Sequence, residues 1–269
     1  MRVHLAKAEE YWRADQLDMA NEAMRRALKV GIPAGHAYNL QRTIEAEWGA
    51  REMSQRVRIH MNLEIEARAE SIEWWDRLVS MAIASLHKVT DELNVVWSKP
   101  ILITLFPFDD WVEFMHSRYG YYTDRETIHK ICLPPTSYTN PTIFRRAVSH
   151  EITHAAVREI GGERVPRWFN EGLAVVMEGS EPTHPPLPKL TLKEISSGFE
   201  SLNVDLRSSQ ASHCYALAGD FMNQLRASCG MERLRVYLAR IGEGSTPEDA
   251  FEIAFRKPQH EAEREWRSG

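Results

Sequence analysis

Two histidines and a glutamate stand at metal-binding spacing in the segment SHEITH. His150 and His154 are four residues apart, and Glu151 directly follows the first of them. On an α-helix, side chains at this spacing lie one turn apart on the same side, so both imidazoles can reach one cation. A carboxylate beside a zinc-bound water can take its proton during attack on a carbonyl. The pattern therefore predicts a zinc site with Glu151 as general base.

The residues around this pattern predict a single helix of about five turns. Asn140 can cap its start, Pro141 suits its first position, and Gly161 or Gly162 can end it. Apolar residues lie almost all the way round the predicted helix, which is typical of a buried one. Burying strongly polar side chains on such a helix is costly unless a partner satisfies them, and a metal ion is such a partner.

A third metal ligand is expected downstream. Catalytic zinc commonly has three protein ligands and one open position. The segment VPRWFNEGLAVVMEG supplies Glu171 among apolar residues of a second predicted helix, which Pro166 can start. Two antiparallel helices joined by a short connection can bring Glu171 to His150 and His154. These three side chains form the expected zinc site.

HEITH followed by RWFNEGLA resembles the gluzincin branch of the zinc peptidases, which contains thermolysin and aminopeptidase N. The resemblance implies that Zn²⁺ is bound by His150, His154 and Glu171, and that Glu151 activates the attacking water. It also implies that Tyr215, near the start of CYALAGDFMNQLRASCG, donates a hydrogen bond to the oxyanion of the transition state. His213 is an alternative donor, and an ordinary core position remains an alternative reading of Tyr215.

The chain departs from the family pattern in two places. The glycine and acid-containing motif that captures a substrate's free amino terminus is absent upstream of His150, which favours an endopeptidase. Val175 stands four residues after Glu171, where a thermolysin-like chain has an aspartate that orients a histidine. The groups that orient the imidazoles are therefore left open. Glu178, seven residues after Glu171, is expected to lie at a solvated helix end.

The predicted fold class is α+β. Strand patterns cover residues 57–65, 101–106 and 129–133, a helical run covers 72–93, and DDWVEFMHSRYG has a helical pattern. We expect a small, mostly antiparallel sheet and a helical lower subdomain that carries the HExxH and NEG helices. The proline-rich GSEPTHPPLPKL is expected to be a loop at the cleft rim.

The resemblance also implies a role for the strand predicted over residues 129–133. These peptidases bind an extended substrate along an exposed sheet edge, and this strand is the candidate edge. Cys132 within it is expected to be buried as a small apolar side chain, with an inhibitory thiolate at the metal as the alternative.

The first fifty residues predict a helical hairpin that resembles a single tetratricopeptide-type unit, with no second copy. The matching packing positions are Ala8, Tyr11, Ala20, Ala27 and Leu28. One repeat cannot bury its apolar face alone, so this segment is expected to pack on the main domain or to recruit a protein partner. The predicted domains are this repeat-like segment over residues 1–50 and a gluzincin-like peptidase domain over residues 56–266.

Composition argues against several other classes of protein. Three cysteines without metal-ligand spacing disfavour a disulfide framework and fit a reducing compartment. A net charge of -5 gives no electrostatic support for binding nucleic acid or anionic membranes. With no apparent secretory signal or spanning segment, we expect a soluble cytoplasmic protein that acts on a peptide or protein substrate.

Three functions remain open at the level of sequence. The leading hypothesis is a zinc-dependent peptidase that hydrolyses peptide bonds. The second is a catalytically silent, zinc-stabilised interaction module whose N-terminal helices recruit a partner. The third is a structural helical protein in which His150 and His154 are core residues.

Overall fold

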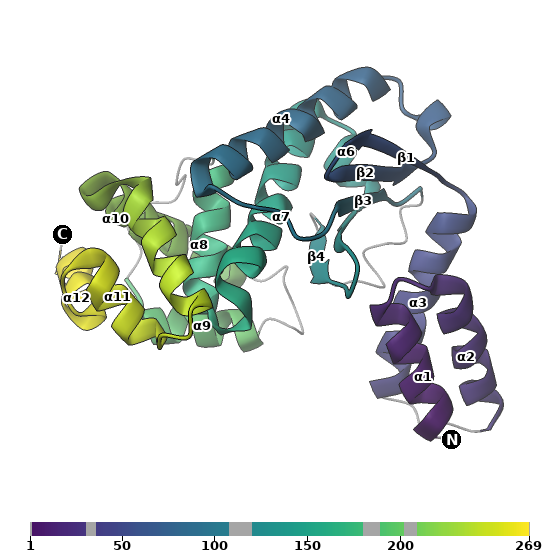
Figure 1. Cartoon of the computed structure of the whole chain (residues 1–269), viewed down its shortest axis with the longest axis horizontal. Coiled ribbons are helices and arrows are strands. Elements are labelled where there is room, and N and C mark those ends of the chain that lie inside the picture. Colours follow the sequence, from purple (N-terminus) through teal and green to yellow (C-terminus); the bar gives the residue numbers. More distant parts are fainter. Residues whose placement is uncertain (1, 31–35, 108–119, 180–188, 202–208, 269) are drawn as a thin grey trace. The chain divides into compact units, whose positions relative to one another are not determined.

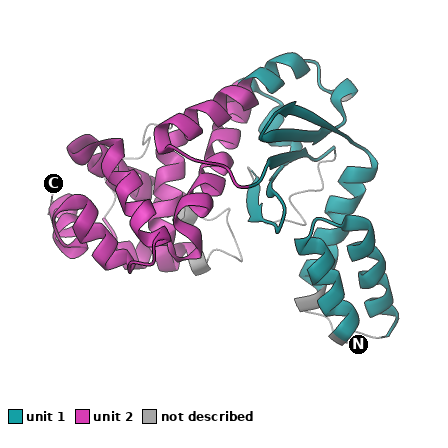
Figure 2. Ribbon diagram, in the orientation of Figure 1, with its two compact units in different colours: residues 1–80, 99–141 teal, residues 81–98, 142–269 magenta. Residues whose placement is uncertain are grey.

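A computed structural model describes the chain in two compact units (Figures 1 and 2). The residues it describes are 2–30, 36–107, 120–179, 189–201 and 209–268. The first unit comprises residues 1–80 and 99–141, and the second comprises 81–98 and 142–269. The N-terminal helices thus share a unit with the strands. The predicted domains over 1–50 and 56–266 are not tested by this division and stay a prediction.

The first unit combines helices with one five-stranded sheet, so the predicted α+β class is confirmed in this coarse form. Its helices are α1 (Arg2–Arg13), α2 (Leu17–Lys29), α3 (His36–Glu52), the short η1 (Ala69–Ser71) and α6 (Pro135–Tyr138). Its strands are β1 (Gln55–His60), β2 (Leu63–Ala67), β3 (Ile101–Leu105), β4 (Tyr121–Asp124) and β5 (His129–Leu133).

The sheet is mixed, which corrects the prediction of a mostly antiparallel one. Its strand order is β1-β2-β3-β5-β4; β2 with β3 and β3 with β5 are parallel, whereas the two outer pairs are antiparallel. The connection from β2 to β3 contains α4 (Trp75–Leu93), and a long crossover of this kind returns the chain in the same direction. Every residue of β2, β3 and β5 is buried, as expected for central strands covered on both faces.

Two predictions about individual strands are wrong. The single strand expected over residues 57–65 is a hairpin, because the chain turns at Met61, which is 76% exposed, between β1 and β2. The strand expected at the sheet edge, residues 129–133, has the predicted bounds but pairs on both sides, with β3 and β4. Both of its hydrogen-bonding sides are therefore occupied, and β4 forms that edge of the described sheet. The predicted helix in DDWVEFMHSRYG lies largely outside the described residues.

The N-terminal helices pack on one another and on the sheet. Alanines of α1 and α2 form a core with Met24 and with Ile44 of α3. The segment predicted as a helical hairpin thus contains three helices, of which α1 and α2 are consecutive. Farther along α3, Ala46 and Ala50 pack against Phe106 and Cys132 of the sheet region. These helices are therefore part of the hydrophobic core of the first unit.

A buried ionic network also joins α3 to the sheet. The Glu47 carboxylate accepts hydrogen bonds at 2.7 Å from Lys130 of β5, from Arg125 and from the Tyr121 hydroxyl. Glu47, Lys130 and Arg125 are almost completely buried, and the Arg125 guanidinium also stacks over the Trp12 ring at 3.5 Å from its centroid. Buried charges of this kind are tolerated because each meets an opposite charge.

All the regular elements among the described residues of the second unit are helices. It contains the second half of α4, then α7 (Pro141–Gly161), η2 (Gly162–Arg164), α8 (Arg167–Glu178), α9 (Leu192–Ser201), α10 (Ser209–Gly242), α11 (Pro247–Phe255) and α12 (Gln259–Ser268). The predicted HExxH helix is α7, with Pro141 first and Gly161 last, and the predicted NEG helix is α8. None of the described helices has both the length and the apolarity needed to cross a membrane.

Aromatic and glycine contacts fix α8 in the second unit. Trp168 packs against Phe221 of α10 with ring centroids 5.4 Å apart, and Phe169 packs against Tyr237 at 4.4 Å. Next to these rings, Gly172 approaches α10 so closely that an added Cβ would lie 2.5 Å from the carbonyl oxygen of Ala218. Glycine therefore allows the two helices to meet directly beside Glu171.

Candidate metal centre

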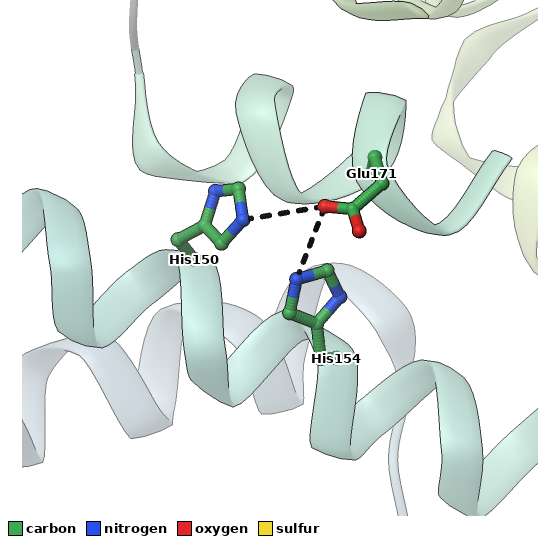
Figure 3. Close-up of side chains that lie close together, drawn as sticks. All are labelled: His150, His154 and Glu171. Carbon is green, nitrogen blue, oxygen red and sulfur yellow. Dashed lines mark ion pairs between the residues drawn. The ribbon is translucent and has the colours of Figure 1, made fainter. Parts of the chain in front are cut away.

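Helices α7 and α8 bring His150, His154 and Glu171 together (Figure 3). One carboxylate oxygen of Glu171, Oε2, lies 3.6 Å from Nε2 of His150 and 3.4 Å from Nε2 of His154. The three potential ligand atoms lie within 4.8 Å of one another. The structure thus places all three predicted ligands at one point.

The two distances to Oε2 are close to those between neighbouring ligand atoms of a tetrahedral metal ion. Ligand bonds of about 2.0–2.2 Å around a tetrahedron separate neighbouring ligand atoms by roughly 3.3–3.6 Å. Oε2 of Glu171 is buried, and no hydrogen-bond donor among the described residues satisfies it. Two imidazole nitrogens and a buried carboxylate oxygen that face one point form a donor set that could hold a divalent cation.

A residue of α8 contacts the Nδ1 side of each imidazole, opposite the nitrogen that faces Glu171. Nδ1 of His150 is 2.9 Å from Oε2 of Glu178, and Nδ1 of His154 is 2.9 Å from Oδ1 of Asn170. Because a carboxylate and an amide oxygen accept hydrogen bonds, each Nδ1 carries the proton. Once the ring loses its second proton, as metal binding requires, Nε2 has a lone pair that faces Glu171.

The other oxygen of Glu171 also has a charged neighbour. Nε of Arg167, one turn earlier on α8, lies 3.7 Å from Oε1 of Glu171. Oε1 is therefore turned toward a cation, while Oε2 points at the histidines. All three candidate ligands are thus supported by other side chains of α8.

The electrostatics of the cluster favour positive charge at its centre. Burial opposes the charged form of His150, but Glu171 and Glu178 outweigh it and raise the pKa of His150 to about 10. Burial likewise opposes ionisation of Glu171, yet His154 and His150 hold the pKa of this carboxyl far below its usual range. A carboxylate that stays ionised when buried is a strong ligand for a cation.

Glu151, the predicted general base, follows His150 on α7 and is 6% exposed. Burial is the main cause that raises the pKa of its carboxyl; the two histidines act in the opposite direction, and Glu171 reinforces the rise. A raised carboxyl pKa suits a residue that must accept and later return a proton near neutral pH.

Tyr215 lies beside the cluster. Its ring centroid is 6.2 Å from that of His150 and 5.0 Å from that of Phe199. Burial and the charge of Glu171 raise the pKa of Tyr215 well above its usual value, so its hydroxyl keeps the proton that a hydrogen-bond donor needs. His213 is two residues earlier on α10, about 200° round the helix, and therefore faces away from the side that Tyr215 presents.

Cys132 belongs to the first unit and is completely buried in its core. Burial is the main cause that strongly raises the pKa of its thiol, and Glu47 adds to the rise. The side chain is therefore a neutral thiol at neutral pH, as expected for a small apolar residue and not for an inhibitory thiolate.

Three supporting residues were not recognised in the sequence. Asn170 directly precedes Glu171, and Arg167 stands one helical turn before it. These positions in the RWFNEG segment are the sequence signal for both residues. Glu178 was expected to be a solvated helix end, but its side chain is only 17% exposed and it binds His150, so that prediction is wrong. Glu178 is seven residues after Glu171, so both side chains lie on one face of α8. This spacing is the sequence feature that indicates a position near the histidines.

Comparison with known proteins adds no assignment. No protein-family model matches the chain, and no curated protein matches it.

Proposed function

We propose that this protein is a zinc-dependent peptidase, with His150, His154 and Glu171 as the metal ligands. The observation that supports the proposal most strongly is the convergence of two Nε2 atoms and a buried, unsatisfied carboxylate oxygen on one point. Three protein ligands leave a fourth tetrahedral position for water, which is typical of catalytic sites and not of structural ones. When bound, zinc supplies Lewis-acid polarisation of a carbonyl and lowers the pKa of water.

Glu151 has the position and the protonation behaviour of the general base. It lies on the same helix as both histidines, in a buried environment that raises the pKa of its carboxyl. Such a carboxylate accepts a proton from water as the water attacks the peptide carbonyl, and it delivers that proton to the leaving amine. Loss of this group should remove hydrolysis without removing a metal ligand.

Tyr215 is the candidate for stabilising the oxyanion. Its hydroxyl stays protonated, and its ring stands beside His150. A donor of this kind contributes roughly 3 kcal/mol to transition-state stabilisation when it is held in place before the reaction. The absence of an exopeptidase motif upstream of His150 favours cleavage within a chain over removal of terminal residues.

The proposal is tested with Glu151→Gln, which keeps the size of the side chain and removes its basicity. We expect wild type and variant to retain about one zinc per chain by elemental analysis, and the variant to hydrolyse a diverse peptide library at least about a hundredfold more slowly. Equal hydrolysis by both proteins would contradict the role of Glu151. Zinc binding by a wild type that cleaves nothing would instead favour the silent interaction module.

A further inference from the structure

We propose that Glu178 is a positioning residue for the metal centre, and that Arg146 holds it in place. This inference rests on the proposed metal site. In this arrangement the Glu178 carboxylate orients the ring of His150 toward the metal, and Arg146 orients the carboxylate of Glu178. Neither Glu178 nor Arg146 is itself a ligand in this scheme.

The imidazole of His150 lies between two carboxylates of the same helix. Glu171 and Glu178 are seven residues apart on α8, which is two turns, so their side chains project from nearly the same face. Glu171 approaches Nε2 of His150 at 3.6 Å, and Glu178 approaches Nδ1 at 2.9 Å. The ring therefore has one nitrogen directed to the metal point and the other directed to Glu178.

The location of Glu178 argues against a merely solvated residue. It is the last residue of α8, and Gly179 closes the helix in a left-handed conformation with φ 76°. A negative charge at a helix C-terminus is repelled by the helix dipole, so this position is unfavourable for a glutamate without cationic or donor partners. Glu178 has such partners, and its side chain is 17% exposed.

Both oxygens of Glu178 are used by residues of α7. Oε2 accepts from His150, while Oε1 lies 3.3 Å from a terminal guanidinium nitrogen of Arg146. Arg146 and His150 are four residues apart, so they lie one turn apart on the same side of α7. The guanidinium thus holds the carboxylate in the orientation that meets Nδ1, and the pair ties the end of α8 to α7.

This arrangement predicts how metal affinity depends on each member. Loss of a carboxylate that orients a metal-binding histidine typically lowers affinity 10- to 100-fold. We expect that range for Glu178→Ala and a smaller loss for Glu178→Gln, since an amide oxygen still accepts from Nδ1. Arg146→Ala should weaken binding about threefold to tenfold, and Arg146→Lys should restore much of it because the cation remains.

The test measures Zn²⁺ affinity by competition with a chromophoric chelator at neutral pH, with folding checked by circular dichroism. The matched control is Glu163→Ala, which removes an exposed glutamate that also pairs with an arginine of α7, Arg158, and should leave affinity unchanged. Glu178→Gln serves as the second variant if the alanine variant does not fold. A proton NMR spectrum of the zinc-loaded protein gives an independent readout, the hydrogen-bonded Nδ1 proton of His150.

The expected result is a loss of affinity in the order given above, together with loss of the His150 Nδ1 proton signal in Glu178→Ala. Wild-type affinity and an unchanged Nδ1 signal in both Glu178 variants would overturn the inference and leave the metal site intact. A wild-type protein that binds no Zn²⁺ would overturn the proposed function itself. The two failures are therefore distinguishable.

Discussion

Replacing Gly172 with alanine tests whether close packing of α8 on α10 holds a metal ligand in place. An added Cβ would lie 2.5 Å from the Ala218 carbonyl oxygen and 3.3 Å from Cβ of Met222. Ordinary contact begins near 3.4 Å, so the two helices must separate by about 0.9 Å (3.4 − 2.5) at this point. Glu171 directly precedes Gly172 and must move with α8.

Two opposing terms set the expected loss of stability. Overpacking a dense contact costs about 1–3 kcal/mol. Alanine in place of glycine within a helix stabilises the helix by up to about 1 kcal/mol. The net destabilisation is therefore about 1–2 kcal/mol, which lowers Tm by several degrees for a unit of this size. Metal ligands must be held within about 0.5 Å, so Zn²⁺ affinity should also fall about tenfold or more.

The assay compares Tm and Zn²⁺ affinity in Gly172→Ala with those in Gly49→Ala. Gly49 lies inside α3, and an added Cβ there meets nothing within 4 Å. This control should therefore stabilise the protein by up to about 1 kcal/mol and leave metal affinity unchanged. If Gly172→Ala were as stable as the control and bound Zn²⁺ with wild-type affinity, the packing explanation for the position of Glu171 would be refuted.

Two further predictions concern acid stability and catalysis. Burial opposes ionisation of Glu47, but Lys130 and Arg125 outweigh it and hold the pKa of this carboxyl at about 2, below its ordinary value of 4.5. The resulting stabilisation is complete above about pH 4.5 and is lost as the pH falls toward 2. Glu47→Gln should lower the free energy of unfolding by about 3–5 kcal/mol at pH 7, because it leaves buried cations unpaired. Urea unfolding at several pH values should also show that the stability of the variant falls less steeply in acid. An unchanged pH dependence would contradict this prediction. Tyr215→Phe should lower kcat about a hundredfold at constant zinc content, whereas an unchanged kcat would make Tyr215 an ordinary core residue.

The two helices that carry the candidate ligands could be predicted from sequence because their signals are local. Asn140 and Pro141 mark the start of α7, Gly161 marks its end, and four-residue spacing places both histidines on one side. Apolar residues around Glu171 indicated a buried carboxylate that needs a partner. Convergence of the two helices followed from the short connection between them.

The contacts that support the ligands could not be predicted because they join distant residues. Glu178 pairs with His150 across 28 positions. Lys130 stands in a short strand where an alternating pattern would place it toward solvent, yet it is fully buried against Glu47, 83 positions away. A sequence pattern records the type of a buried charge but not the partner that neutralises it.

Strand pairing was also beyond local patterns. The turn at Met61 lacks the glycine that usually marks a hairpin, so β1 and β2 read as one strand. The direction of β3 depends on the long connection through α4, and the internal position of β5 depends on its pairing with β3 as well as with β4. Such features become visible once the strands are paired.

The central claim is that His150, His154 and Glu171 bind one zinc ion. Crystals of the protein reconstituted with Zn²⁺, measured on both sides of the zinc absorption edge, test it most directly. We predict a single anomalous peak per chain within bonding distance of both Nε2 atoms and Oε2 of Glu171, with one position open to water. No peak at this point, or a zinc ion bound without Glu171, would contradict the account.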